Sequence, residues 1–212
     1  AHYALNLQER KEFKFAAPDL GILLHAIMHQ FGEILVKRQI SWQDVTHEQC
    51  QQICKQIIKT IAPKLQNEIL LSSNRYRHLL QRIEQLSIDS LMRLVEFAKH
   101  SEFSPKALEQ DFGANSSMPP LLFTDEDNHK IEIIGQIDRI DFNDNYYLVI
   151  DYKSGNAFIN LLQVYYGLKL QLLTYLLVAQ NTTLQLYNME NAIPAGILYC
   201  FLKTPIITGT NK

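Results

Sequence analysis

The 212-residue sequence has few cysteines, no long apolar run and no excess of positive charge, and each absence excludes a class of protein. Three cysteines, an odd number, argue against a disulfide framework and favour a reducing compartment, so we expect a cytoplasmic protein. No run approaches the roughly 18 apolar residues of a membrane helix, and the start lacks signal-peptide regions, so no membrane partner is expected. The net charge of -2 excludes a generally basic, histone-like binder but allows a locally basic cleft.

What is present is enough apolar material for a substantial core, because 47% of the residues are hydrophobic. The predicted elements are, in order, helices over 20–35, 42–61 and 73–100, strands over 107–112 and 121–123, a hairpin over 131–152, a helix over 160–180 and a strand over 192–202. This order predicts an α/β sandwich. We expect a helical region over residues 1–104 and a sheet-containing core over residues 105–212, which together form one domain.

The most informative segment is residues 135–155, where acids and a lysine interrupt a pattern typical of a buried β-hairpin. Val, Ile and Tyr dominate both predicted strands, and a polar turn separates them. If the turn is the dipeptide Asp144-Asn145, Asp138 faces Asp151 across the hairpin. Directly opposed residues have Cβ atoms about 4.5–5.5 Å apart. The two carboxylates are then close enough to share one divalent cation.

A lysine lies on the same face of this hairpin. Lys153 is two residues beyond Asp151, whereas Arg139 and Asp141 point to the other face, where we expect a structural or salt-bridging role. Opposed acids repel unless a cation or a proton neutralises them, and oxygen ligands at this density suit Mg²⁺ or Mn²⁺. Spacing alone leaves a second interpretation open, a solvated hairpin face with a surface Asp–Lys pair.

The double motif GQIDRID and VIDYKSG resembles the PD-(D/E)xK nuclease core in its RecB-like branch. The resemblance implies a restriction-endonuclease-like sheet flanked by helices, and a metal-dependent deoxyribonuclease. It also implies that Asp138, Asp151 and the backbone carbonyl of Tyr152 hold Mg²⁺, with Mn²⁺ possible. Lys153 would orient the attacking water and stabilise charge in the transition state.

Two further constellations match the same family. His25, alone, fits a partly buried histidine, and with His29 it forms a zinc-like pair that no other His or Cys cluster completes. Its GxxxH setting resembles the family's early helix, which implies a metal ligand. Gln171 and Tyr175 are neighbours at i and i+4 on a predicted helix. One interpretation is ordinary helix packing, with Tyr175 in the core and Gln171 at its edge. The family's QxxxY pair instead implies a role in arranging the site and the DNA strand.

Two other sets of residues have both a structural and a functional interpretation, and a third set has a structural one. Glu109, on the strand before the hairpin, is either a further acid at the edge of the site or a surface glutamate. Tyr165 and Tyr166 are either packing aromatics, the commoner case, or platforms for bases of single-stranded DNA. Cys50 and Cys54 are expected to be buried thiols.

Beyond these motifs, four stretches resemble the C-terminal nuclease domain of AddB/RexB proteins, including LNLQERKEFKFAAPDLGILLH and VYYGLKLQLLTYL. This implies an unwound duplex or single-stranded DNA substrate and a heterodimer with an AddA/RexA-type helicase-nuclease subunit. No GxxxxGK[ST] loop occurs, so ATP dependence would come from elsewhere. We expect a piece of a longer protein, and the resemblance implies that the cysteines of the family's iron–sulfur cluster would lie outside this sequence. A catalytically idle domain for DNA threading or docking is the alternative, and a restriction-type endonuclease a third.

Overall fold

The computed structural model describes residues 17–64, 74–155, 157–186 and 192–202. The elements are, in chain order, α1 (Ala17–Arg38), the 3₁₀ turn η1 (Trp42–Asp44), α2 (His47–Ile61), the 3₁₀ turn η2 (Ala62–Lys64), α3 (Asn74–Lys99), β1 (Ser104–Phe112), β2 (Leu121–Thr124), β3 (Lys130–Ile133), β4 (Gly135–Asn143), β5 (Tyr146–Lys153), α4 (Leu161–Tyr165), α5 (Gln171–Leu186) and β6 (Ile193–Phe201). The predicted order of a helical front, an antiparallel run, helix and final strand is present.

The first three helices are amphipathic and share one core. The buried side chains of α1 recur at intervals of three and four, and they are Leu23, Leu24, Ile27, Met28, Phe31 and Leu35. Helix α2 begins at a capping box, in which the hydroxyl of Thr46 accepts from the Gln49 N–H and the Gln49 side chain accepts from the Thr46 N–H. Because this cap starts a new helix after η1, the predicted single helix over 42–61 is two elements.

Helix α1 also passes a simple test for a membrane span. Its segment Pro18–Arg38 is long and apolar enough by length and composition, which is weak evidence because core helices of soluble proteins pass the same test. The fully buried apolar stripe of α1 packs on α2 and α3, and this packing accounts for its composition.

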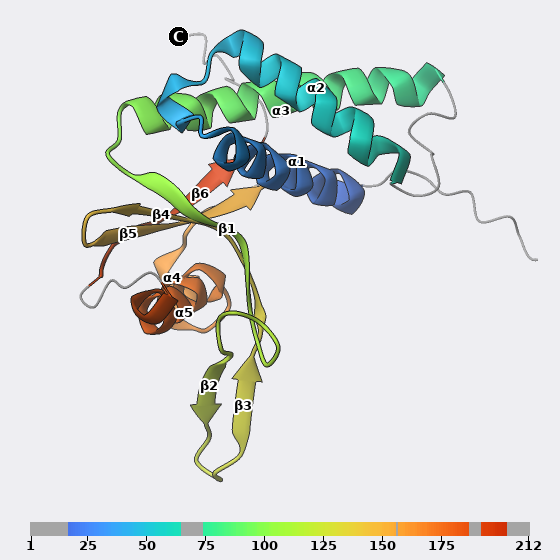
Figure 1. The fold of residues 1–212 in the computed structure, drawn as a ribbon. Helices are drawn as coiled ribbons and strands as arrows, with labels where there is room; N and C mark the ends of the chain where they lie inside the picture. The colour runs from blue at the N-terminus through green and yellow to red at the C-terminus, as the bar shows by residue number, and fades with distance from the viewer. Residues whose placement is uncertain (1–16, 65–73, 156, 187–191, 203–212) are drawn as a thin grey trace, which may run out of the picture.

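The main sheet has the strand order β1-β4-β5-β6, with β1, β4 and β5 antiparallel and β6 parallel to β5. The β2–β3 hairpin forms a separate two-stranded sheet that projects from the body of the molecule (Figure 1). The predicted strand over 131–140 is interrupted at Ile134, because the residues before it pair with β2 and those after it pair with β1.

Helices cover both faces of the main sheet (Figure 1). On β5, Leu148, Ile150 and Tyr152 join the core beneath α1, α2 and α3. The alternate residues Tyr147 and Val149 join the second core, beneath α5. A strand buried on both faces explains the continuous apolar run in the sequence. The predicted α/β sandwich with flanking helices is confirmed.

The prediction of one helix over 160–180 is wrong, because the chain breaks between α4 and α5. Gly167 has φ +73, a left-handed conformation that glycine adopts without steric strain. The N–H of the next residue, Leu168, donates to the carbonyl of Gln163 at 2.8 Å, which closes the end of α4. The apolar spacing continues through this break, so periodicity alone does not reveal it.

Candidate active site

The two hairpin acids lie where the sequence places them. Asn143 pairs with Tyr146 across the two-residue turn, and this register, followed along the strands, sets Asp138 across from Asp151. The N–H of Tyr152 donates to Oδ2 of Asp138 at 2.6 Å. Asp138 is 7% exposed and Asp151 1%, so both carboxylates are buried rather than on a solvated hairpin face.

The other charged pair of the hairpin is structural. Nε and Nη2 of Arg139 donate to the two carboxylate oxygens of Asp141, each at 2.6 Å, and both side chains are fully buried. The guanidinium lies 4.6 Å from the ring centroid of Trp42, at the base of the helical layer. Burial disfavours the charged guanidinium, but Asp141 outweighs it and the pKa of Arg139 is raised. The predicted salt-bridging role on the opposite face is confirmed.

Lys153 connects the acids to α5. Its ammonium forms an ion pair with Oδ2 of Asp151 and donates to Oε1 of Gln171 at 2.9 Å. Nε2 of Gln171 in turn donates to the hydroxyl of Tyr175 at 2.9 Å, so the predicted i, i+4 neighbours are in contact. The break after α4 makes this possible, because Gln171 becomes the first residue of a new helix facing the end of β5.

His25 reaches the same point from α1. A Cβ on Gly21 would lie 3.1 Å from Oγ of Ser154, so the absence of a side chain lets α1 approach the end of β5 closely. One turn later, Nε2 of His25 lies 3.0 Å from the backbone carbonyl of Tyr152, and the two rings meet edge to face. Nδ1 of the same ring lies 3.4 Å from Oδ1 of Asp138.

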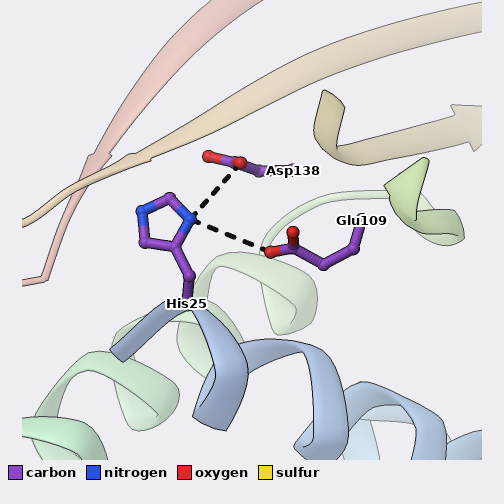
Figure 2. A group of neighbouring side chains, drawn as sticks. All are labelled: His25, Glu109 and Asp138. Carbon is purple, nitrogen blue, oxygen red and sulfur yellow. Dashed lines mark ion pairs between the residues drawn. The ribbon is translucent and has the colours of Figure 1, made fainter. Parts of the chain in front are cut away.

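Glu109 is the acid whose position the sequence left open. Its neighbours on β1 pair on either side of Asp138, which puts the two acids across from each other on β1 and β4. Oε1 of Glu109 lies 3.8 Å from Nδ1 of His25 (Figure 2). Glu109 has φ 49, which a non-glycine residue adopts only at a cost and which is common at functional sites. The sequence offered Glu109 as one of two alternatives but could not pair it with Asp138, because the β1–β4 register is non-local.

Crowding of these groups alters their proton affinities. Burial, followed by the charge of Asp138, raises the pKa of Glu109 from 4.5 to about 7. Burial also raises the pKa of Asp151, against the opposing effect of Lys153. Burial of the His25 ring disfavours its charged form, but the neighbouring Asp138 outweighs burial and the pKa is raised. Like charges held together in a buried site favour binding of a cation or of protons.

Three of these side chains have the geometry to hold a metal ion together. Ligand atoms of His25, Glu109 and Asp138 all lie within 4.8 Å of one another. Two predicted ligands lie outside this group of three. The carbonyl of Tyr152 contacts the His25 ring, and the carboxylate of Asp151 pairs with Lys153. The set of one imidazole and several carboxylate and carbonyl oxygens suits Mn²⁺ and Mg²⁺.

A second group, at the tip of the β2–β3 hairpin, differs from the first in exposure. Asp125, Asp127 and His129 also bring ligand atoms within 4.8 Å, but all three are exposed. Asp125 accepts hydrogen bonds from backbone and side-chain groups of the same tip, which explains the cluster as a turn.

Three other candidate residues, two cysteines and a histidine, do not join the site. Cys50 and Cys54 are buried in α2, and burial raises the pKa of Cys50 to about 11 and that of Cys54 to about 12, as expected of inert thiols. His29 pairs with Glu33, one turn along α1, at 3.6 Å.

The two adjacent tyrosines contradict the commoner expectation. Tyr165 and Tyr166, interpreted first as packing aromatics, are 82% and 66% exposed. Tyr165 is the last residue of α4 and Tyr166 is its C-cap, and this five-residue helix buries none of its side chains.

The fold and the site together define a nuclease of the Asp-x-Lys type, in which opposed acids and a lysine meet at the end of two sheet strands. The sequence matches the PD-(D/E)XK nuclease superfamily over residues 1–212, and the chain belongs to that family.

Curated relatives agree with this assignment. The chain is 39% identical over 214 aligned residues to the B subunit of the ATP-dependent helicase/deoxyribonuclease of Bacillus cereus (strain G9842). It has the same identity to the proteins of that name from Bacillus thuringiensis (strain Al Hakam) and Bacillus anthracis. Each alignment covers 98% of this chain, which spans only 18% of the length of each relative.

Proposed function

We propose that the chain is a Mg²⁺-dependent DNA exonuclease domain, with Mn²⁺ as an alternative metal. The observation that carries the proposal is the clustering of three carboxylates around one imidazole and one ammonium: Asp138 and Asp151 are buried and Glu109 is half-buried. Such an accumulation of negative charge is costly unless a cation compensates it. The proposal adds the metal and the mode of cleavage to the family membership.

The metal ligands proposed are His25, Asp138, Asp151 and the backbone carbonyl of Tyr152, with Glu109 as a further acid. The fit rests on the donor set and on Oε1 of Glu109, which is buried and accepts no hydrogen bond from the described residues. A bound divalent cation supplies Lewis acidity and lowers the pKa of a coordinated water. The chain's own contribution is to fix the position of Asp138, whose Oδ2 accepts a hydrogen bond from the Tyr152 N–H.

Lys153 is the residue proposed to act on the reacting groups. Its ammonium lies between Asp151 and Gln171, a position from which it can orient the attacking water and stabilise negative charge developing on the phosphate. Gln171 limits where the ammonium can point, and Tyr175 limits Gln171. The role of Gln171 and Tyr175 is therefore to position Lys153 and the DNA strand.

We propose further that the domain works in the cytoplasm, within a longer helicase-nuclease protein of the AddB/RexB kind. Its partner would be an AddA/RexA-type subunit that supplies the ATP-driven motor, and the pair would process double-strand breaks for recombination. Support comes from the identity to curated helicase/deoxyribonuclease subunits and from the absence of a GxxxxGK[ST] loop in this sequence. The DNA would then arrive as a single strand or an unwound duplex.

Cleavage of an end-labelled single-stranded oligonucleotide tests the proposal. The wild-type chain, Lys153→Ala and a control, Lys59→Ala on the exposed face of α2, are each incubated with Mg²⁺, Mn²⁺ or EDTA. We expect metal-dependent cleavage by the wild type and the control. Loss of a preorganised charge at a reacting centre typically lowers kcat by about 100- to 1000-fold, and this is the loss expected for Lys153→Ala.

The other outcomes separate the alternatives. Equal cleavage by the wild type and Lys153→Ala would refute the chemistry proposed for Lys153. Cleavage that persists in EDTA would refute the metal requirement. If none of the three proteins cleaves, the result favours the alternative of a catalytically idle domain. The same variants should then be assayed in the full-length protein with its partner.

A further inference from the structure

The segment between Lys153 and Gln171 exposes an unusual amount of apolar and aromatic surface. Six large side chains in it are more than half exposed, and they are Tyr165, Leu161, Leu168, Tyr166, Leu162 and Phe158. The two tyrosine rings contact each other edge to face, with centroids 5.3 Å apart. Exposed patches of this kind in folded proteins commonly mark binding surfaces. We call the segment over residues 157–170 the aromatic platform.

The backbone of the platform is held in place although its side chains face solvent. The side chain of Asn160 caps α4 by accepting from the N–H groups of Leu162 and Gln163. At the other end, the N–H groups of Tyr166 and Gly167 donate to carbonyls within α4 at 3.0 and 2.9 Å. The tyrosines are therefore presented to solvent on an ordered turn, which lowers the entropy cost of binding a ligand to them.

The platform is continuous with the active site. Lys153 precedes it, Gln171 follows it, and these two residues are hydrogen-bonded to each other at 2.9 Å. Tyr166 lies five residues before Gln171, so their Cα atoms are at most about 18 Å apart. Stacked nucleotides in a strand are about 3.4 Å apart. A strand whose phosphate lies at Lys153 would therefore have the tyrosines within reach of its next several nucleotides.

The charge of this region is compatible with a polyanion. Residues 152–186 contain no aspartate or glutamate, although the chain has 22 acidic residues. The positive charges in that stretch are Lys153 and Lys169. The Lys169 ammonium lies 4.1 Å from the ring centroid of Phe158, within the platform. Aromatic faces interleaved with cations are typical of surfaces that bind single-stranded nucleic acid.

We propose that the aromatic platform stacks the bases of the DNA strand next to the scissile phosphate, with Tyr165 and Tyr166 as the stacking residues. This inference rests on the proposed deoxyribonuclease function and adds a positioning subsite to it. Every base has a π-face, so the subsite would hold the strand without reading its sequence. It would let a nuclease follow a strand of any sequence.

Binding in EDTA, where no cleavage occurs, tests the stacking directly. Fluorescence anisotropy compares a labelled single-stranded oligonucleotide with one of equal length in which the bases are replaced by abasic sites. The proteins are the wild-type chain, Tyr165→Ala, Tyr166→Ala and the control Tyr146→Ala, whose ring is 47% exposed at the turn end of β5. Tyr165→Phe and Tyr166→Phe keep the rings and should keep the affinity.

We expect each alanine variant at the platform to bind the normal oligonucleotide about 5- to 150-fold more weakly. The abasic oligonucleotide should bind all proteins alike. If the wild type binds the normal and abasic strands equally, or if both alanine variants bind like Tyr146→Ala, the stacking proposal is wrong. The exposed apolar surface would then be assigned to contact with another polypeptide.

A small phosphodiester separates this inference from the proposed catalysis. Bis(p-nitrophenyl) phosphate is too short to span the platform and the acids, so with Mn²⁺ the wild type and the platform variants should hydrolyse it at equal rates. If the wild type binds the normal oligonucleotide more tightly than the abasic one but does not cleave this diester, the stacking proposal stands and the catalytic proposal is refuted. Equal loss of diester cleavage in Tyr165→Ala and Tyr166→Ala would indicate a general structural defect and overturn the subsite.

Discussion

Replacing Glu109 by glutamine should stabilise the metal-free chain at pH 8 and weaken its response to Mg²⁺ or Mn²⁺. The Glu109 carboxyl is largely buried, faces Asp138 and has its pKa raised from 4.5 to about 7. An acid with a raised pKa binds its proton more tightly in the folded chain than in the unfolded one. The free energy of unfolding therefore falls as the pH rises from 4.5 to 7.

The size of the effect follows from the two pKa values. The interval from 4.5 to about 7 corresponds to about 3 kcal/mol, at roughly 1.36 kcal/mol per pKa unit. Glutamine keeps the shape of the side chain but cannot ionise, so the variant avoids this cost above pH 7. Both proteins carry a neutral group below pH 4.5, where the difference should vanish. The left-handed backbone at Glu109 is unchanged, so its strain does not contribute.

Urea denaturation in EDTA, followed by the fluorescence of the single tryptophan, Trp42, measures this difference. At pH 8 we expect Glu109→Gln to unfold with a free energy about 3 kcal/mol higher than the wild type, and at pH 5 with a much smaller difference. Glu132→Gln, at an exposed position on β3, is the matched control and should change little. Added Mn²⁺ should stabilise the wild type more than Glu109→Gln. A variant no more stable than the wild type at pH 8, or equally stabilised at both pH values, would refute this reasoning.

Three further predictions follow from the same contacts. Arg139→Met should cost about 3–5 kcal/mol in urea denaturation, because it leaves the buried Asp141 unpaired, whereas Arg139→Met combined with Asp141→Leu should cost less; equal losses would contradict this. Gln171→Ala should lower kcat on an oligonucleotide about tenfold or more, through a lost hydrogen bond to a charged group, while the free energy of unfolding changes by less than about 1 kcal/mol. Mn²⁺ affinity, measured by calorimetry, should rise from pH 6 to pH 8 because Glu109 and His25 must release protons; an affinity independent of pH would argue against these ligands.

Local pattern predicted the hairpin well. The register of β4 and β5 follows from a two-residue turn and from alternation along two adjacent strands, so Asp138 and Asp151 could be placed opposite each other from sequence. The same alternation assigned Arg139 and Asp141 to the other face, where they form a buried ion pair. The i, i+4 spacing on one helix also predicted the contact between Gln171 and Tyr175.

Features that depend on distant parts of the chain could not be obtained this way. Glu109 enters the site through the pairing of β1 with β4, whose register shifts between Pro105 and Ala107. The end of α4 depends on the left-handed conformation of Gly167, which interrupts an apolar periodicity that reads as one helix. Tyr165, the last residue before that break, is exposed, which the apolar periodicity did not indicate.

The central claim is that the buried acids between α1 and the main sheet hold a divalent cation. Anomalous diffraction from crystals of the wild-type chain soaked in Mn²⁺ tests it most directly. The account predicts a manganese peak bounded by His25, Asp138 and Asp151, next to the carbonyl of Tyr152. A chain that cleaves DNA with this position empty, or a peak confined to the exposed cluster at Asp125, would contradict it.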